Sequence, residues 1–157
     1  MASVTEAIIL NSIKYSETSV IMKCYSQNYG ILSFIIKGVR SRKRTKFSLG
    51  RIEPLSIVEI EFNRLKKGEL SHLKNIKSVV IYDDLRFNII KSNIALFLAE
   101  FLSNVLRFQE ENASLYQYIK DSLVTLDKIS KYENFHINFL INLLKFLGIK
   151  PETNNEN

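Results

Sequence analysis

The chain has 157 residues, of which 46% are hydrophobic and 24% charged, the composition of an ordinary globular protein with a buried core. No apolar stretch reaches the roughly 18 residues that a membrane-spanning helix needs, and the N-terminus lacks the basic start of a secretory signal. Its single cysteine, Cys24, excludes an internal disulfide, so we expect a protein of the cytoplasm without a membrane partner.

The net charge of +6 is unevenly distributed along the chain. Residues 1–82 hold 14 Lys and Arg against 6 Asp and Glu, whereas residues 83–157 hold 8 against 10. The basic excess therefore belongs to the first half. This asymmetry favours a polyanionic partner such as nucleic acid, with a solubilising surface as the alternative.

Five β-type segments follow one another in the first half, separated by glycines and turn residues. We predict strands over residues 6–13, 19–26, 31–37, 55–62 and about 69–81. Gln27–Gly30 has the composition of a tight turn, and the alternation slips near Leu73, which indicates a bulge. Five strands at this spacing favour a small closed antiparallel barrel of OB-fold size, and the pattern alone leaves an SH3-like barrel open.

The hydrophobic period changes to that of helices at about Tyr82. Asp83 and Asp84 are candidate N-caps for a first helix, and Asn112 is the candidate for a second. The predicted inward stripe of the first helix consists of Ile90, Ile94, Phe97, Leu98, Phe101, Val105 and Phe108.

The second helix has Leu115 or Tyr116, Ile119, Leu123 and Leu126 on its predicted inward face. A third helix is predicted from about Glu133 to Leu147, with Phe139, Leu140, Leu143, Leu144 and Leu147 inward. Gly148 and Pro151 would end it. The predicted organisation is thus an α+β protein with a barrel over residues 1–82, a small helical bundle over 83–151 and a disordered tail over 152–157.

A strongly basic segment joins the third and fourth predicted strands. It carries six cations and no carboxylate: Lys37, Arg40, Arg42, Lys43, Arg44 and Lys46. Clustered like charges of this kind attract phosphate backbones, and contacts to phosphate carry no base sequence. The sequence therefore predicts nucleic-acid binding with little sequence preference.

Aromatic residues near this segment suggest how unpaired bases could be held. Tyr29 and Phe47 are the candidates for base stacking, and simple packing within the barrel is the alternative reading of both.

Catalytic, metal-binding and cofactor-binding patterns are missing from the sequence. The two histidines, His72 and His136, have no partner at ligand spacing, and Cys24 lies in a predicted strand without a neighbouring base. Phosphate-cradling glycine motifs are also missing. We expect a protein that is not an enzyme and has no catalytic residue, metal or cofactor.

Taken in order, several of these segments resemble the bacterial RecO family of recombination mediators. They are Glu6–Leu10 with Tyr15–Glu17, Gly30–Ser33 with Lys37–Arg40, Ile52–Leu55 with Glu59–Phe62, Leu85–Arg86, Ala99–Glu100 and Leu144–Pro151. The resemblance covers about residues 4–151. It implies an OB-fold followed by a helical domain.

The resemblance also implies a function in DNA repair in the bacterial cytoplasm, associated with the nucleoid. A member of this family would bind single- and double-stranded DNA, anneal complementary strands, and work with RecR and the single-stranded-DNA-binding protein to help load RecA. The six cations would then hold the DNA backbone. Members usually continue past the Leu-Gly-x-x-Pro element, so the resemblance implies a shortened form.

Two other functions remain as alternatives. An RNA-binding OB-fold protein would use the same basic segment and aromatic residues. A protein-interaction adaptor would bind partners through its helices and keep the barrel only as a scaffold.

Overall fold

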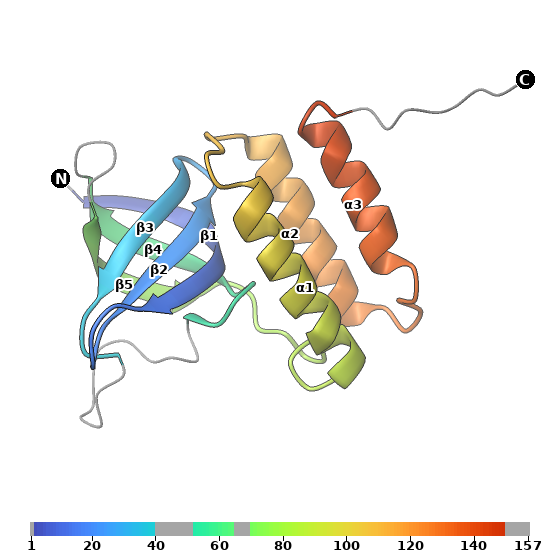
Figure 1. Ribbon diagram of the computed structural model, residues 1–157, viewed down its shortest axis with the longest axis horizontal. Helices are drawn as coiled ribbons and strands as arrows, with labels where there is room; N and C mark the ends of the chain where they lie inside the picture. The colour runs from blue at the N-terminus through green and yellow to red at the C-terminus, as the bar shows by residue number, and fades with distance from the viewer. Residues whose placement is uncertain (1, 40–51, 65–69, 150–157) are drawn as a thin grey trace, which may run out of the picture.

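The computed structural model describes residues 2–39, 52–64 and 70–149. A closed five-stranded barrel lies side by side with three helices (Figure 1). The strands are β1 (Ala2–Lys14), β2 (Val20–Ser26), β3 (Gly30–Ile36), β4 (Ile57–Asn63) and β5 (Ser71–Ser78). The helices are α1 (Ile89–Val105), α2 (Ala113–Lys128) and α3 (Phe135–Phe146). The predicted fold class, a barrel followed by a helical bundle, is confirmed.

The barrel has the strand order β1-β2-β3-β5-β4, and β4 pairs back onto β1 to close it. β1 pairs with both β2 and β4, and a register shift between Ile9 and Asn11 bends it so that it can reach both strands. The β3–β5 pairing is parallel, with Phe34 opposite Ser71, which corrects the purely antiparallel expectation. The reason is topological: β2 and β4 both run against β1, so β3 and β5 run in the same direction.

The alternation that predicted the strands is visible in their burial. On β4, Val58, Ile60 and Phe62 are buried, whereas Glu59 and Glu61 are half-exposed. The expected irregularity near Leu73 is also present, because the β4–β5 register shifts between Glu61 and Phe62. The period-two pattern therefore reported the true inward face of the sheet.

Two hydrophobic cores hold the molecule together. One fills the barrel and includes Ala7, Ile9, Met22, Cys24, Phe34, Ile36, Val58, Ile60, Phe62 and Ile76. The other joins the barrel to the helices and includes Ile8, Leu10, Tyr25, Leu55, Ile57, Leu98, Leu102, Leu115, Tyr116, Ile119 and Leu123. Alternate residues of β1 face these two cores, so this strand belongs to both halves.

The two halves of the molecule approach each other closely at the β2–β3 turn. Gly30 has a φ of +70°, and a Cβ atom at this position would lie 2.7 Å from the carbonyl oxygen of Gln109. The backbone N–H of Ile31 donates to that same oxygen at 3.2 Å. Only glycine suits both the left-handed backbone and the space, so the predicted Gln27–Gly30 turn also docks the barrel onto the segment after α1.

The N-cap prediction for the first helix is wrong. Asn88 caps α1, and its side-chain oxygen accepts from the N–H groups of Ile90 and Lys91 at 3.0 and 3.1 Å. Asp83 and Asp84 lie one turn earlier, where their backbone N–H groups donate to the carboxylate of Asp127 at 3.0 and 2.9 Å. These acids precede the helix because the chain first makes a turn tied to α2.

The predicted inward stripe of α1 is only partly right. Leu98 is buried, but Phe97 and Ile90 are exposed and Phe108 is 87% exposed. The buried face consists of Lys91, Ala95, Leu98, Ala99 and Leu102, followed by Leu106. Because α1 is apolar on nearly every side, the spacing of its hydrophobic residues did not identify which face is buried. Lys91 lies on the buried face, and a lysine is not expected there from sequence.

The other two helices agree more closely with expectation. The side chain of Asn112 caps α2 by accepting from the N–H of Leu115 at 3.0 Å, and the predicted inward residues of α2 are buried. On α3, Phe139 and Leu143 are buried, and Gly148 has the left-handed φ of +74° typical of a residue that follows a helix. Within the described part of the chain, no helix has the length and apolar character of a membrane span.

Candidate nucleic-acid interface

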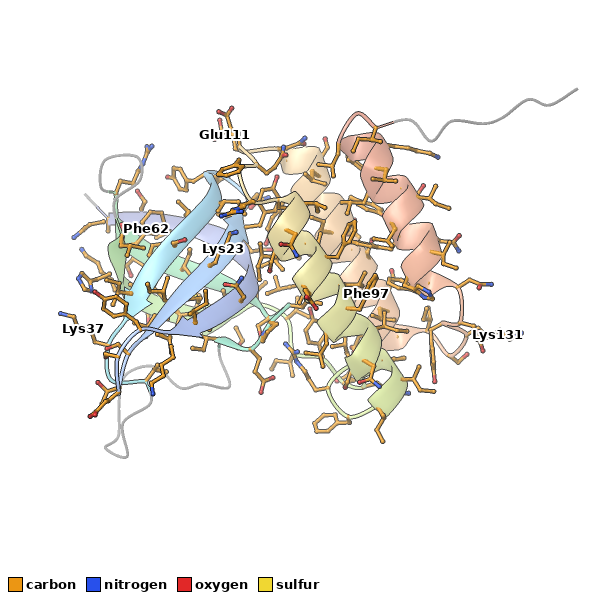
Figure 2. The ribbon with its side chains drawn as sticks, in the orientation of Figure 1. Lys23, Lys37, Phe62, Phe97, Glu111 and Lys131 are labelled. Atoms are coloured by element: carbon orange, nitrogen blue, oxygen red, sulfur yellow. The ribbon has the colours of Figure 1, made fainter. Side chains whose placement is uncertain are left out.

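The predicted basic segment begins at the end of β3. Lys37 directly follows this strand and is exposed at one end of the barrel (Figure 2). The other predicted contacts, Arg40, Arg42, Lys43, Arg44 and Lys46, lie outside the described residues, as does the stacking candidate Phe47. The structure therefore places the attachment point of the segment.

The described part of the barrel is almost neutral. It carries six basic residues, Lys14, Lys23, Lys37, Arg64, Lys74 and Lys77, and five acidic residues, Glu6, Glu17, Glu53, Glu59 and Glu61. The other eight basic residues of this half, with a single acidic one, fall in residues 40–51 and 65–69. The basic excess is therefore concentrated in the two segments that join β3 to β4 and β4 to β5.

Three carboxylates of the barrel are held in ion pairs. Glu6 pairs with Lys120 of α2 at 2.6 Å. Glu53 pairs with Arg86 at 3.4 Å, and Glu59 pairs with Lys77 at 3.2 Å. Two of these pairs use cations from the helical half, so they link the halves and also reduce the negative charge next to the barrel.

Lys23 contributes a cation on the outer face of β2. In the sheet register it lies opposite Asn11 of β1 and Ser33 of β3, and its Nζ donates to the carbonyl oxygen of Ser103 at 3.2 Å. Partial burial, and secondly the charge of Arg107, lower the pKa of Lys23 below its usual 10.5. Among the described residues, no ion pair involves Lys23 or Lys37.

Tyr29 lies at the opposite end of β3 from Lys37, so the structure does not bring these two predicted residues together. Its ring meets Phe62 edge to face with centroids 5.7 Å apart, and the guanidinium of Arg64 lies 4.8 Å from its centroid. Tyr29 is half-buried. Packing against Phe62 and partial burial leave less of this ring open to a base than a fully exposed ring would offer.

Lys23 was missed in the sequence because it stands alone between apolar residues of a strand. The alternation held a signal, since Met22 and Cys24 point into the barrel and Lys23 must then point outward. In the sequence, a single lysine on the outer face of a barrel strand looks like an ordinary solvent-exposed residue. Its position beside Arg107 depends on how the helices dock, which the sequence does not state.

Cys24 and His136 both pack against neighbouring side chains of the fold. Cys24 is completely buried in the barrel core, and burial raises the pKa of its thiol to about 12. His136 packs edge-on against Phe97, with ring centroids 6.4 Å apart. In the described residues, no three metal-ligating side chains come together.

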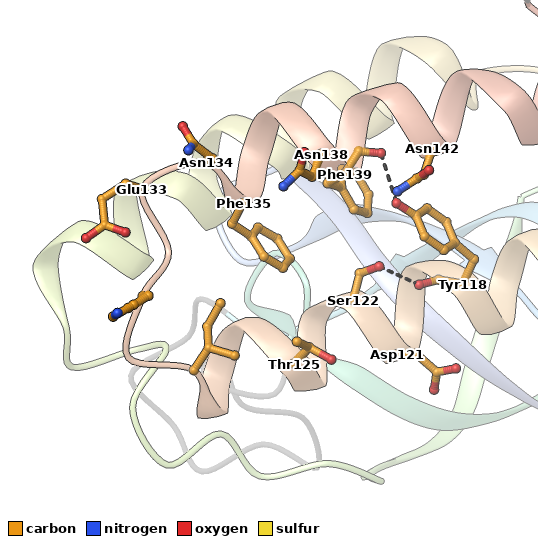
Figure 3. A pocket seen from close by; sticks show the side chains of 12 residues that line it. Tyr118, Asp121, Ser122, Thr125, Glu133, Asn134, Phe135, Asn138, Phe139 and Asn142 are labelled. Atoms are coloured by element: carbon orange, nitrogen blue, oxygen red, sulfur yellow. Dashed lines mark hydrogen bonds between the residues drawn. The ribbon is translucent and has the colours of Figure 1, made fainter.

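A cavity of about 540 Å³ lies between α2 and α3 (Figure 3). Asn134, Asn138 and Asn142 line its α3 side, and Tyr118 donates from its hydroxyl to the carbonyl oxygen of Phe139 at 2.9 Å. The rings of Tyr118 and Phe139 stack with centroids 5.5 Å apart. The lining mixes amides, aromatic rings and both charge signs, so it lacks the cationic character of a phosphate site.

A closed β1-β2-β3-β5-β4 barrel is an OB-fold, and here a three-helix bundle follows it, which places the protein among OB-fold proteins with an added helical domain. Residues 1–82 match the family described as "Recombination protein O N terminal", and residues 86–157 match "Recombination protein O C terminal". The chain belongs to the RecO family.

Curated relatives give the same assignment. The chain is similar to the DNA repair protein RecO of Christiangramia forsetii, at 36% identity over 94% of this chain and 62% of the relative. It is similar to that of Bacteroides fragilis, at 38% identity over 96% and 62%. It is also similar to the DNA repair protein RecO of Phocaeicola vulgatus, at 36% identity over 98% of this chain and 64% of the relative. The chain thus spans less than two thirds of the length of these relatives.

Proposed function

We propose that this chain is a DNA-binding recombination mediator in DNA repair. It would bind single- and double-stranded DNA through its barrel, largely independently of sequence, and anneal complementary strands. RecR and the single-stranded-DNA-binding protein would be its protein partners, and through them it would assist the loading of RecA. It would act in the bacterial cytoplasm on the nucleoid, without catalysing a covalent step.

One observation carries this proposal. The six-cation segment of residues 37–46 directly follows β3 of an OB-fold, a type of barrel that commonly binds nucleic acids. Lys37 and Lys23 extend the positive charge from this attachment point onto the described surface. Membership in a family whose relatives are named DNA repair proteins supports DNA as the polyanion.

Annealing also has a physical basis in this arrangement. Two complementary strands repel each other through their phosphates, and a protein that neutralises those phosphates without reading bases lets the strands approach. The bases of a loosely held strand remain free to pair. The helical half has a net charge of −2, which suits it to contacts with proteins more than with DNA.

The test compares binding of this chain to fluorescein-labelled single-stranded DNA, duplex DNA and RNA of the same sequence, at two salt concentrations. A second assay follows annealing of complementary strands by energy transfer between end labels. We expect binding to both DNA forms and faster annealing. A strong preference for RNA would point to the RNA-binding alternative. Absence of binding to any nucleic acid would favour the protein-interaction adaptor.

A further inference from the structure

Lys23 and Arg107 form a pair of like charges where β2 meets the end of α1. Arg107 follows the C-cap residue Leu106 and is exposed. The bond from Lys23 to the carbonyl oxygen of Ser103 fixes one cation at the C-terminal end of α1, where the helix dipole favours positive charge. Arg107 places a second cation near the first. Such a pair attracts an anion that both can share.

Phe108 adds an exposed aromatic ring to this pair. Its side chain is 87% exposed, and the guanidinium of Arg107 lies 5.4 Å from its ring centroid. A phenyl ring held in water adds little to the stability of the fold, but it offers a face to a planar ligand. Aromatic rings next to Arg are the typical platform for unpaired bases, because every base has a π-face.

A continuous outer surface connects this corner to Lys37. Along β2 and β3, the outward register pairs between the two cations are Ile21 opposite Ile35 and Lys23 opposite Ser33. These four side chains are half-buried, and three of them are uncharged. From Ser33 to Lys37 the strand covers roughly 13 Å. A few nucleotides span this distance, within the range that one OB-fold binds.

We propose that Lys23, Arg107 and Phe108 form a second contact for single-stranded DNA, separate from the basic segment. The two cations would bind phosphate, and Phe108 would stack on one unpaired base. This inference rests on the proposed function and adds a strand path from the end of β3 across β2 to the corner between α1 and α2. Because the bases of a duplex have no free face, this contact selects single strands.

The acidic residues that follow Phe108 lie beyond this path. Tyr25 donates from its hydroxyl to the carbonyl oxygen of Glu110 at 3.4 Å, which ties that part of the loop to the end of β2. In Figure 2, Glu111 extends past the end of the β2–β3 hairpin, whereas Lys23 lies on the strand itself. Glu111 therefore lies on the side of this corner that faces away from Lys37 (Figure 2).

A single tryptophan tests the stacking directly, since the chain contains none. In Phe108→Trp, titration with oligothymidine should quench the tryptophan fluorescence and saturate together with the anisotropy of the labelled oligonucleotide. Duplex DNA should leave the fluorescence nearly unchanged. Phe87→Trp is the matched control, because Phe87 is 80% exposed just before α1 begins, at the other end of that helix, and should not be quenched.

A second variant tests the energetics. In Arg107→Ala with Phe108→Ala, we expect the affinity for oligothymidine to fall on the order of 10-fold, with a much smaller change for duplex DNA. Circular dichroism and the melting temperature should match the wild type, because both side chains are exposed. Equal loss for both DNA forms would mean that the corner contributes charge without stacking, and would overturn the inference.

The outcomes separate this inference from the proposed function. If the wild-type chain binds neither DNA form, the proposed function fails. If it binds oligothymidine while the Phe108→Trp variant shows no quenching at saturation, only the second contact fails. Quenching of the Phe87→Trp and Phe108→Trp variants to the same extent would indicate a general effect of the bound strand and would also contradict stacking at Phe108.

Discussion

The buried ammonium of Lys91 donates to the backbone carbonyl oxygen of Asp127 at 3.0 Å, and so joins the start of α1 to the end of α2. Lys91 is only 2% exposed, and its charge is balanced by Asp84 at 2.8 Å. The carboxylate of Asp127 accepts from three successive backbone N–H groups, those of Asp83, Asp84 and Leu85. This network holds the connection between barrel and bundle in one conformation.

Replacing Asp127 with Asn should lower the free energy of unfolding by about 3 kcal/mol, because the backbone donors lose their ionic acceptor and Lys91 loses a nearby negative charge. Urea denaturation measures the change. Asp121→Asn is the control on the same helix: Asp121 is exposed and, within the described ranges, accepts from Gln117 alone, so its loss should cost less than about 0.5 kcal/mol. Equal effects of the two substitutions would contradict the network.

The Asp127 network should also depend on pH. Burial opposes ionisation of Asp127, but the hydrogen bonds from Asp84, Leu85 and Asp83 and the charge of Lys91 outweigh it, so its pKa lies below the usual 3.8. A lowered folded-state pKa stabilises the fold above pH 3.8, and this stabilisation is lost as the pH falls through the folded value. The stability difference between wild type and Asp127→Asn should therefore shrink as the pH falls below 3.8.

Gly30→Ala should destabilise the protein by about 2–3 kcal/mol, because the new Cβ would clash with backbone atoms of Gln109 and Glu110 at 2.7 and 2.8 Å and the backbone is left-handed. Gly148→Ala separates the two causes, since Gly148 has a φ of +74° but no atom of the described residues within 4 Å of the place that a Cβ would take. It should cost about 1 kcal/mol. Similar losses in urea denaturation would show that the close approach at Gly30 does not matter.

Cys24 should not react with Ellman's reagent at pH 8 while the protein is folded. With a pKa of about 12 from burial, the thiolate fraction at this pH is about 0.01%, and the sulfur has no access to the reagent. In 6 M guanidinium chloride, one thiol per chain should react within minutes. Rapid reaction of the folded protein would mean that the barrel core opens easily.

The salt dependence of DNA binding should show whether the cations of the basic segment contact phosphate. If all six cations meet phosphate, log K for single-stranded DNA falls with log salt at a slope of about −4, and replacing Arg42, Arg44 and Lys43 with Ala should reduce it to about −2. The matched control removes the same charge from exposed positions of the helical half: Lys128, Lys131 and Lys145. It should leave the slope unchanged. A slope that responds equally to both variants would exclude a dedicated DNA segment.

The barrel could be predicted because its strands each bury one face, so that residues such as Val58 and Ile60 alternate with Glu59 and Glu61. The parallel β3–β5 pairing could not, because it results from closing the sheet and leaves no local pattern. The cap at Asn112 was recognisable, whereas Asp83 and Asp84 attract an N-cap prediction on residue type alone. Their true partner, Asp127, lies more than 40 residues away.

The candidate site was predictable only where charge is dense in the sequence. The basic run from Lys37 to Lys46 stands out by composition. Lys23, Arg107 and Phe108 come from a strand and from the end of a helix, and only docking of α1 against β2 brings them together. The helical spacing predicts Phe108 on the inward stripe of α1. The helix ends at Val105, however, so this spacing no longer applies at residue 108.

The core that joins the two halves has a mechanical consequence. Ile8, Leu10 and Tyr25 of the barrel pack in the same cluster as Leu98 and Tyr116 of the helices. Separating the halves would expose this cluster to water, and that cost opposes independent movement of the barrel and the helices. The shared core therefore favours one distance and one angle between a ligand bound to the barrel and a partner bound to the helices.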